Sequence, residues 1–555
     1  MRVALCTCKG KIEREELKKL EKSFDVQVFD NLCEEKPEEF FDVVGCSYKL
    51  VGDLGKFQID LNDLVFLRQD NATEKAELLL KAYRKMFEVE REVMRINVSS
   101  SFLVETDDVE FAKELQKIFT PLYVVTRNKE MKGVGIPIMG KVTGFEGELG
   151  SFRVFIDGVN MHTGEAVESV VVSQLLIPGM KLRKDGAFNV KSDVLDAISN
   201  VGEFAKFKAV EYDASRCAAS FNEVSGCKLC ECTHECLIRE RYIRIEHRNC
   251  FGCGRCASLC PTDALEFSLM PGEVVEEIIN TLSGYREEKV LLYVCKEALG
   301  KVYGGEKTGT FFPVVVPCVA ALSEVDIIYP LLRGFNGVYV LYCSDCPHGS
   351  FDGLRLAESI CEAFDIDNIV HSEEFDERQI EMLLKRSPVD TEFDLRGSNK
   401  REKLLKIVKR IEEKRELKVR KLSFPGFGKV NVSYACTLCE TCHKVCPTGA
   451  LKKEGGKLKF SHGLCIGCKL CEKLCPENAI AVKDELDLGE FCYEIIVRED
   501  DLLECPRCGK RHISKREYQK LSELTGQKYS LMFCRDCRAV VIFEGIYREI
   551  FGGEK

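Results

Sequence analysis

The chain has 555 residues, enough for roughly three to five domains. Lys and Arg total 80 against 90 for Asp and Glu, and the net charge of −10 argues against nucleic acid as the main ligand, because phosphate binding needs a basic face. No run of about 18 apolar residues occurs and the first residues lack the apolar core of a signal peptide, so we expect a cytoplasmic protein. In a reducing compartment, closely spaced members of its 31 cysteines indicate metal ligands rather than disulfides.

The N-terminal cysteines follow short predicted strands. Apolar runs at 3–5, 26–29 and 43–45 alternate with a helical segment at 13–20. The carboxyl ends of neighbouring parallel strands meet at one edge of a sheet, so thiols placed there converge. We expect one [4Fe–4S] cluster on four cysteines: Cys6, Cys8, Cys33 and Cys46.

Residues 227–261 contain one regular and one irregular cluster motif. The regular half has the C-x2-C-x2-C-x3-C-P spacing of bacterial two-cluster ferredoxins and consists of Cys250, Cys253, Cys256 and Cys260 with Pro261. The irregular half is one residue short, has no proline, and consists of Cys227, Cys230, Cys232 and Cys236. Either Cys232 reaches its cluster through a loop adjustment or Cys217 replaces it. Because the fourth cysteine of each half binds the neighbouring cluster, two sets are expected: Cys250, Cys253, Cys256 with Cys236, and Cys227, Cys230, Cys232 with Cys260. A single cluster with a decayed partner is the alternative.

Three strongly apolar runs precede the next group of cysteines. The runs at 290–294, 314–316 and 338–341 are rich in β-branched residues, which is typical of strands buried on both faces of a parallel sheet. Thiols after such strands meet at one sheet edge and can hold a cluster. The residues expected there are Cys295, Cys318, Cys343 and Cys346, whereas Cys361 is expected in the core of a helix at 354–364.

Residues 398–421 are highly charged. Leu404, Val408 and Ile411 fall on one helical face. Acidic residues are interleaved with the basic ones, so we expect a connecting helix rather than a nucleic-acid arm.

The strongest motif lies at 436–476, where two complete C-x2-C-x2-C-x3-C-P runs follow one another. A pair of zinc knuckles would need neither the crossed fourth ligand nor the prolines. We assign two [4Fe–4S] sites: Cys436, Cys439, Cys442 with Cys475, and Cys465, Cys468, Cys471 with Cys446.

Two C-x2-C pairs end the chain. Their spacing suits a tetrahedral four-sulfur site for structural zinc, with a rubredoxin-type iron as the alternative. No open coordination position is implied, so we expect a structural role. The ligands would be Cys505, Cys508, Cys534 and Cys537.

Two regions carry a resemblance to known families. The segments RVALCTCKG, VVGCSYKL and FLRQDNATEKAELLLKAYRKM, with the isolated Cys33, resemble the N-terminal cluster domain of the A subunit of heterodisulfide reductase. The segments VLLYVCKEALG, PVVVPCVAAL and FNGVYVLYCSDCPHG resemble the delta subunit of methyl-viologen-reducing hydrogenase, a [2Fe–2S] domain that passes electrons to that A subunit. The fusion is also similar to the B subunit of the quinone-interacting membrane-bound oxidoreductase. The resemblance implies a [2Fe–2S] cluster on Cys295, Cys318, Cys343 and Cys346, although the first delta motif lacks its cysteine pair and leaves the first ligand open.

The A subunit continues into a flavin domain that opens on a glycine-rich turn, where backbone amides hold the pyrophosphate. Here the strand at 96–98 runs into SSSFLVETDD, whose serines and acids replace the glycines. Strands are expected within LYVVTRN, VTGFEGELGSFRVFIDG and ESVVVSQLLIPG. The resemblance therefore implies a shrunken remnant of that domain, in which bound FAD is not expected.

We predict a multidomain α/β plus α+β protein with Rossmann-like cluster domains, two ferredoxin-like domains and a C-terminal zinc ribbon. Its expected role is electron relay through about five [4Fe–4S] clusters and one [2Fe–2S] cluster, with no substrate site of its own. The resemblance implies partners among heterodisulfide-reductase-like subunits, a hydrogenase, formate- or deazaflavin-oxidising subunit, a flavin-bearing paralogue, or ferredoxin. The alternatives are a flavin enzyme in its own right, a subunit of a quinone-linked membrane complex, or a redox-sensing or scaffold protein.

The predicted domains are 1–95 (N-terminal [4Fe–4S]), 96–185 (flavin-domain remnant), 186–270 (ferredoxin-like), 271–397 ([2Fe–2S]), 398–422 (linker helix), 423–490 (ferredoxin-like) and 491–555 (zinc ribbon).

Overall fold

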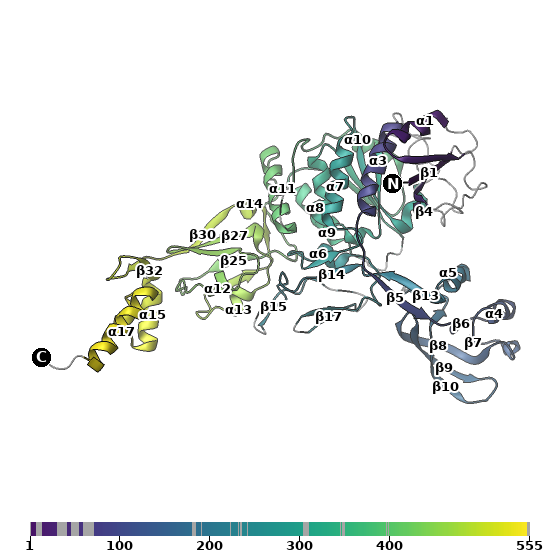
Figure 1. Cartoon of the computed structure of the whole chain (residues 1–555), viewed down its shortest axis with the longest axis horizontal. Helices are drawn as coiled ribbons and strands as arrows, with labels where there is room; N and C mark the ends of the chain where they lie inside the picture. Colours follow the sequence, from purple (N-terminus) through teal and green to yellow (C-terminus); the bar gives the residue numbers. More distant parts are fainter. Residues whose placement is uncertain are drawn as a thin grey trace.

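The structure is a computed structural model in which the chain forms a string of α/β and cysteine-rich modules (Figure 1). The N-terminal sheet and the central sheet lie together, a β-rich unit projects from them, and the C-terminal helices lie at the far end of the molecule. Among the described helices, none combines the length and the apolar character that a membrane crossing requires. The described residues are 2–6, 14–29, 41–45, 55–58, 72–179, 185–189, 191–221, 224–230, 232, 236–240, 242–302, 310–344, 346, 350–395, 397 and 399–551.

The N-terminal sheet is parallel, with strand order β2-β1-β3-β4. Three of its strands lie at the predicted apolar runs, and the predicted helical segment forms α1 (Arg14–Lys18) and a 3-10 turn. Helix α3 (Ala72–Phe87) follows and packs against the central domain. The strands are β1 (Arg2–Cys6), β2 (Asp25–Phe29), β3 (Phe41–Gly45) and β4 (Gly55–Gln58).

The β-rich unit is joined to the rest of the chain by an antiparallel pair, β5 (Val93–Val98) and β13 (Gly202–Phe207). The predicted strand at 96–98 therefore belongs to this connection and not to the sheet of the unit. The seven-stranded sheet has the order β10-β9-β8-β7-β6-β11-β12, parallel from β8 to β12 and antiparallel from β8 to β10. Its strands are β6 (Phe102–Glu105), β7 (Leu122–Thr126), β8 (Ile136–Glu148), β9 (Ser151–Asn160), β10 (Ala166–Val172), β11 (Gln174–Leu176) and β12 (Ala187–Phe188).

The central sheet is parallel, with order β21-β20-β22-β23, and its first three strands are fully buried as their apolar sequences predict. Helices α7 (Gly272–Ser283), α8 (Glu324–Leu332), α9 (Asp352–Ala363) and α10 (Glu377–Leu384) accompany it. A capping box formed by Ser323 and Asp326 starts α8. The strands are β20 (Val290–Cys295), β21 (Phe311–Val316), β22 (Gly337–Leu341) and β23 (Ile369–Ser372).

The first cysteine-rich module, residues 210–267, is closed by pairing of β14 (Val210–Tyr212) with β19 (Leu265–Phe267). A second hairpin pairs β17 (Leu237–Arg239) with β18 (Ile243–Ile245), and α6 (Arg255–Leu259) carries part of the regular motif. A small extra hairpin is formed by β15 (Ser220–Phe221) and β16 (Val224–Ser225).

The second cysteine-rich module, residues 429–483, repeats this plan. Strand β25 (Lys429–Val432) pairs with β28 (Ile480–Lys483), and β26 (Leu451–Glu454) pairs with β27 (Lys457–Ser461). The short helices α12 (Thr441–Lys444) and α13 (Leu470–Lys473) follow the first cysteines of each run.

Helix α11 (Lys400–Lys414) confirms the predicted connecting helix. Leu404, Val408 and Ile411 are buried on one face, within the same apolar core as the central sheet. Beyond the second module, the chain ends in hairpin β31 (Leu502–Glu504) and β32 (Arg511–Ser514), followed by α15 (Lys515–Thr525), α16 (Lys528–Leu531) and α17 (Arg535–Phe551).

Candidate iron–sulfur and metal centres

The second cysteine-rich module brings its eight motif thiols together in two groups. Each group lines a cavity of about 20 Å³, and in each the fourth cysteine comes from the other run. This is the crossed arrangement that the spacing predicts for two cubane clusters. One cavity is lined by Cys436, Cys439, Cys442 and Cys475, and the other by Cys446, Cys465, Cys468 and Cys471.

The loops around these thiols direct backbone N–H groups at sulfur. The first thiols of the two runs, Cys436 and Cys465, accept hydrogen bonds from the N–H groups of Leu438 and Gly467. Both donors have positive φ, 60° and 64°, a conformation that is uncommon for leucine and turns the amide toward the site. Such hydrogen bonds stabilise negative charge on the sulfurs of an iron–sulfur cluster.

Burial favours the protonated form of two of these thiols, one in each group. It raises the pKa of Cys442 and of Cys465 to about 12 each. A thiolate ligand is therefore formed by cluster binding itself, as is usual for metal sites.

The regular half of the first module has the same loop geometry. Cys250 accepts a hydrogen bond from the N–H of Gly252, whose φ is 70°, and Gly254 begins the turn into α6 with φ of 68°. The thiols of Cys253 and Cys256 interact electrostatically with Cys250 and with Cys232. Cys236 lies beside Cys232 and Cys250 and also donates to the carbonyl of Asn249 at 3.1 Å.

The irregular half gathers a second group of thiols. Cys230 interacts electrostatically with Cys217 and Cys260, and Cys227 interacts with Cys230 and Cys260. The hydroxyl of Tyr212 hydrogen-bonds the Cys217 thiol. The sequence left Cys217 and Cys232 open as alternative ligands. Cys217 lies near the thiol of Cys230, whereas Cys232 lies near the thiols of the regular half.

The thiols at the carboxyl edge of the central sheet form a closed ring, as expected from the strand ends. Each thiol hydrogen-bonds two others, in the order Cys295, Cys318, Cys346, Cys343 and back to Cys295. Hydrogen bonding from Cys318 lowers the pKa of Cys295 to about 6 against the opposing effect of burial. Four thiols from three strand ends form a donor set that fits a small iron–sulfur cluster. Cys361 is instead fully buried in α9, in agreement with the prediction that it is a core residue.

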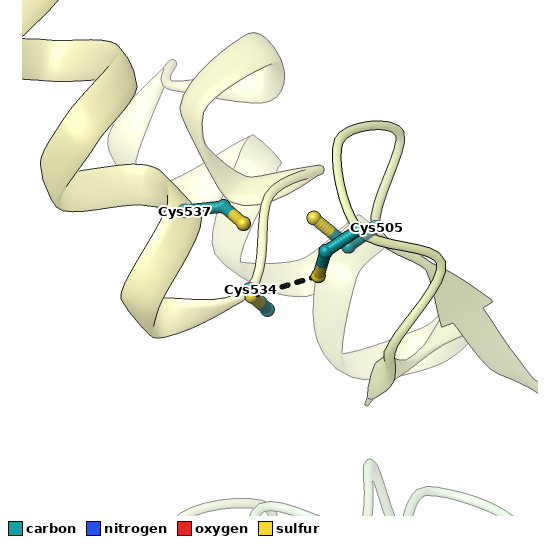
Figure 2. Close-up of side chains that lie close together, drawn as sticks. Cys505, Cys534 and Cys537 are labelled. Carbon is teal, nitrogen blue, oxygen red and sulfur yellow. Dashed lines mark hydrogen bonds between the residues drawn. The ribbon is translucent and has the colours of Figure 1, made fainter.

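The C-terminal thiols form the most compact group. Within the described part of the chain, they form the one group of three or more potential ligand residues whose ligand atoms all lie within 4.8 Å of one another, close enough for a single ion. Figure 2 shows Cys534 and Cys537 at the start of α17 facing Cys505 on the hairpin. Burial opposes ionisation of Cys505, yet backbone N–H groups led by that of Cys534 lower its pKa to about 6. Cys508 completes the set at 3.7 Å from Cys534.

The predicted N-terminal site falls outside the described residues. Strand β1 ends at Cys6 and β3 ends one residue before Cys46, so the backbone of both strands runs to the same edge of the parallel sheet. The side chain of Cys6 and all of Cys8, Cys33 and Cys46 are not among the described parts, and this [4Fe–4S] assignment stays a prediction.

Contacts between modules place the sites in a series. The hydroxyl of Ser258, on α6, donates to the carbonyl of Ala320 at 2.8 Å, just after Cys318 of the central ring. At the other side of the first module, Cys227 interacts electrostatically with Cys468 of the second module. The ring, both halves of the first module and the second module are therefore contiguous.

A buried arginine that the sequence analysis did not single out lies at the second of these junctions. Arg401 of α11 interacts electrostatically with both Cys465 and Cys227, donates to the carbonyl of Gly426 at 2.8 Å, and stacks on Phe427 with its guanidinium carbon 3.9 Å from the ring centre. Its Nη1 is buried and has no hydrogen-bond partner. Its burial follows from packing between modules, which the alternating charges of 398–421 do not reveal.

The turn after β6 has carboxylates where a dinucleotide-binding turn needs free donors. Asp108 accepts the N–H of Phe111 at 3.1 Å and thereby caps α4 (Val109–Gln116). Asp107 accepts from the hydroxyl of Thr126 and the N–H of Arg127, each at 2.7 Å. The helix start is thus occupied by acidic side chains, which would repel a pyrophosphate.

Two family matches agree with these groups. Residues 435–480 match the family described as a 4Fe-4S dicluster domain, and residues 243–266 match the family described as a 4Fe-4S binding domain. No curated protein matches the chain. The chain therefore carries two 4Fe-4S ferredoxin-type domains and a C-terminal cysteine cluster in a mixed α/β setting, an assembly that supports an electron-transfer role.

Proposed function

We propose that the chain is the electron-transfer subunit of a heterodisulfide-reductase-like oxidoreductase complex. Electrons would pass between a donor dehydrogenase or hydrogenase and a reductase or ferredoxin, and the chain would have no substrate site of its own. Bound clusters would supply the one-electron steps. The protein's own residues hold the thiolates, supply N–H donors to sulfur and exclude water.

The observation that carries this proposal is the contiguity of the thiol groups. From the central ring, the series continues through α6 to the regular site, then to the group around Cys230, and across Cys227 and Cys468 to the second module. The electrostatic interaction between Cys256 and Cys230 joins the two sites within the first module. A redox sensor needs one responsive cluster, whereas a relay needs several that are neighbours.

The proposed electron donor and acceptor come from the resemblance to known families. A central-sheet ring of the hydrogenase delta type, as a [2Fe–2S] site, would receive electrons from a hydrogenase-, formate- or deazaflavin-oxidising subunit or a flavin-bearing paralogue. The acidic turn at Asp107 and Asp108 favours a chain without FAD over the flavin-enzyme alternative. The four-sulfur site at the C-terminus is proposed to hold a structural zinc ion.

The test is anaerobic purification of the intact complex, with mass-spectrometric identification of its subunits and counting of iron and acid-labile sulfide on the isolated chain. Partner oxidoreductase subunits and a multi-cluster iron content are expected. A chain that purifies alone, and whose clusters do not pass electrons from a reduced donor to an acceptor, would favour the sensor or scaffold alternative.

A further inference from the structure

The irregular half of the first module departs from the usual spacing, and its backbone shows where the departure lies. In the two regular runs of the second module, the first cysteine follows a strand and closes a turn in which its N–H bonds the carbonyl three residues earlier. The distances are 3.3 Å for Cys436 and 3.0 Å for Cys465. Cys250 makes the same bond at 3.2 Å.

Cys217 occupies this first position in the irregular half. It follows β14 as Cys250 follows β18, and its N–H bonds the carbonyl of Ala214 at 3.3 Å. The bond between the ends of each module provides a second match. Asp213, four residues before Cys217, donates its N–H to the carbonyl of Ala264 at 2.8 Å, and Ser433, three residues before Cys436, donates to that of Ala479 at 2.8 Å, where each alanine lies four residues after the fourth cysteine of the opposite half. The spacing at Cys217 thus differs by one residue from that at Cys436, and it equals the four-residue distance that separates Cys250 from Glu246 and Cys465 from Ser461, each of which makes the corresponding bond.

The fourth cysteine of the irregular half can be located by the same kind of backbone hydrogen bond. In the second module, Ser461 donates its N–H to Ala450, four residues after Cys446, and in the first module Glu246 donates to Cys236, each at 2.8 Å. Cys236 thus stands where the regular motif has alanine. The residue four positions earlier, in the place of Cys446, is Cys232.

We propose that the irregular motif runs Cys217, Cys227, Cys230, Cys232, with Cys236 outside the ligand set. One [4Fe–4S] cluster would then bind Cys217, Cys227, Cys230 and Cys260, and the other Cys250, Cys253, Cys256 and Cys232. This inference deepens the proposed relay and rests on it.

The segment between the first two ligands explains the irregular spacing. Residues 218–226 contain the β15–β16 hairpin, whereas regular motifs have only two residues there. The hairpin contacts α13 of the second module: Lys473 donates to the carbonyl of Ser225, and a side chain at Gly226 would meet Leu470 at 3.1 Å. The insertion therefore lies at the junction where Cys227 approaches Cys468.

The described residues between 226 and 232 contain no helix, so another group must hold the third ligand. Arg239 does so. Its guanidinium donates to the carbonyls of Lys228 at 2.8 Å and Cys230 at 2.9 Å, and to the sulfur of Cys230 at 3.5 Å. A charged donor at this sulfur suits a thiolate ligand of a cluster.

The test compares the full chain with single variants, all purified anaerobically, by iron and sulfide content and by Mössbauer and EPR spectra. Cys217→Ala, Cys217→Ser and Cys232→Ala are each expected to lose one cluster, about four irons per chain. Cys236→Ala and the core control Cys361→Ala are expected to keep the full content. A Cys217 variant with wild-type iron and spectra would overturn the inference.

The Cys217 variants could fail to fold. In that case Cys236→Ala still tests the ligand assignment, because loss of a cluster in this variant would overturn it. A wild-type chain without iron would instead refute the proposed relay. The two failures are therefore distinguishable.

Discussion

Arg401 is the residue through which the junction between the two modules can be tested. Its guanidinium interacts electrostatically with thiols of two neighbouring sites, and the residue is only 5% exposed. A buried positive charge favours the reduced, more negative form of a cluster, since electrostatic interactions are strong where water is excluded.

We predict that Arg401→Gln lowers the midpoint potential of the cluster held by Cys465 and its partners by tens of millivolts. For a one-electron couple, about 59 mV corresponds to a tenfold change in the equilibrium constant of reduction. EPR-monitored redox titration measures it. Arg401→Lys, which keeps the charge, should restore most of the potential, and the exposed Arg378→Gln should change nothing. Unchanged or raised potentials in Arg401→Gln would contradict this role.

His462 gives the second module a pH dependence. Its buried ring hydrogen-bonds the carbonyl of Gly428 at 3.1 Å through Nδ1 and accepts the N–H of Asp487 at 2.8 Å through Nε2, an arrangement that requires the neutral form. Burial is the main cause that lowers the pKa of His462. Because the unfolded chain then binds more protons below its ordinary pKa of about 6.5, the free energy of unfolding decreases as pH falls through that value.

The expected slope is at most about 1.4 kcal/mol per pH unit below pH 6.5. Anaerobic guanidinium unfolding of the full chain at pH 7.5, 6.5 and 5.5 measures it. The free energy of unfolding of His462→Asn should be lower than that of the wild type at pH 7.5 and should depend less on pH. His162 is exposed, so His162→Asn should behave as wild type. An equal slope in all three proteins would refute the assignment.

At the scale of elements, α3 covers the edge strand of the central sheet. The Tyr83 hydroxyl donates to the carbonyl of Pro313 at 3.0 Å and accepts the N–H of Val315 at 3.2 Å, both on β21. Removing the hydroxyl leaves two buried backbone groups unpaired. Tyr83→Phe should therefore reduce the free energy of unfolding by about 1–3 kcal/mol and accelerate hydrogen exchange at Val315.

Tyr493→Phe is the matched control, because Tyr493 is 58% exposed. Exchange at Val315 that is as slow in Tyr83→Phe as in this control would show that α3 does not protect the strand.

The C-terminal element contains the four-thiol group and can be tested through it. Four thiols join a hairpin to α17, and the hairpin touches the second module through the Ser514 hydroxyl, which donates to the carbonyl of Thr437 at 2.7 Å. Few buried apolar side chains support this unit, so we expect metal binding to supply much of its folding free energy.

We predict that Cys534→Ser releases about one metal ion per chain and exposes residues 502–551 to hydrogen exchange, while the cluster signals of the second module persist. Metal analysis by mass spectrometry and exchange measurements check both. Cys492→Ser, at a thiol outside any of the groups described above, should keep the metal. Retention of the ion by Cys534→Ser would contradict the proposed ligand set.

At the scale of the whole molecule, local signals in the sequence were the reliable ones. The β-branched runs predicted buried strands, and the structure has strands there. The thiols at the ends of these strands lie together, because the geometry of a parallel sheet fixes where strand ends meet. Regular cysteine spacing also predicted the crossed sites of the second module, because the spacing within each run places three thiols around one site and the fourth at the other.

Long-range features escaped prediction. In the proposed assignment the β15–β16 hairpin separates Cys217 from the rest of its motif, so spacing alone could not indicate that Cys217 and Cys232 both serve as ligands. The sequence predicts a strand at 96–98 that opens the flavin-domain remnant, but this strand pairs with β13 in the connection, since pairing of distant strands leaves no local signature. The burial of Arg401 depends on the packing of three segments and has no signature in the charge pattern.

Stepwise anaerobic reduction of the full chain, followed by low-temperature EPR, tests whether the neighbouring clusters form one relay. We expect several signals of reduced [4Fe–4S] clusters that broaden through mutual magnetic coupling as their neighbours become reduced. A colourless chain without acid-labile sulfide, or clusters whose signals stay sharp and independent throughout the titration, would contradict it.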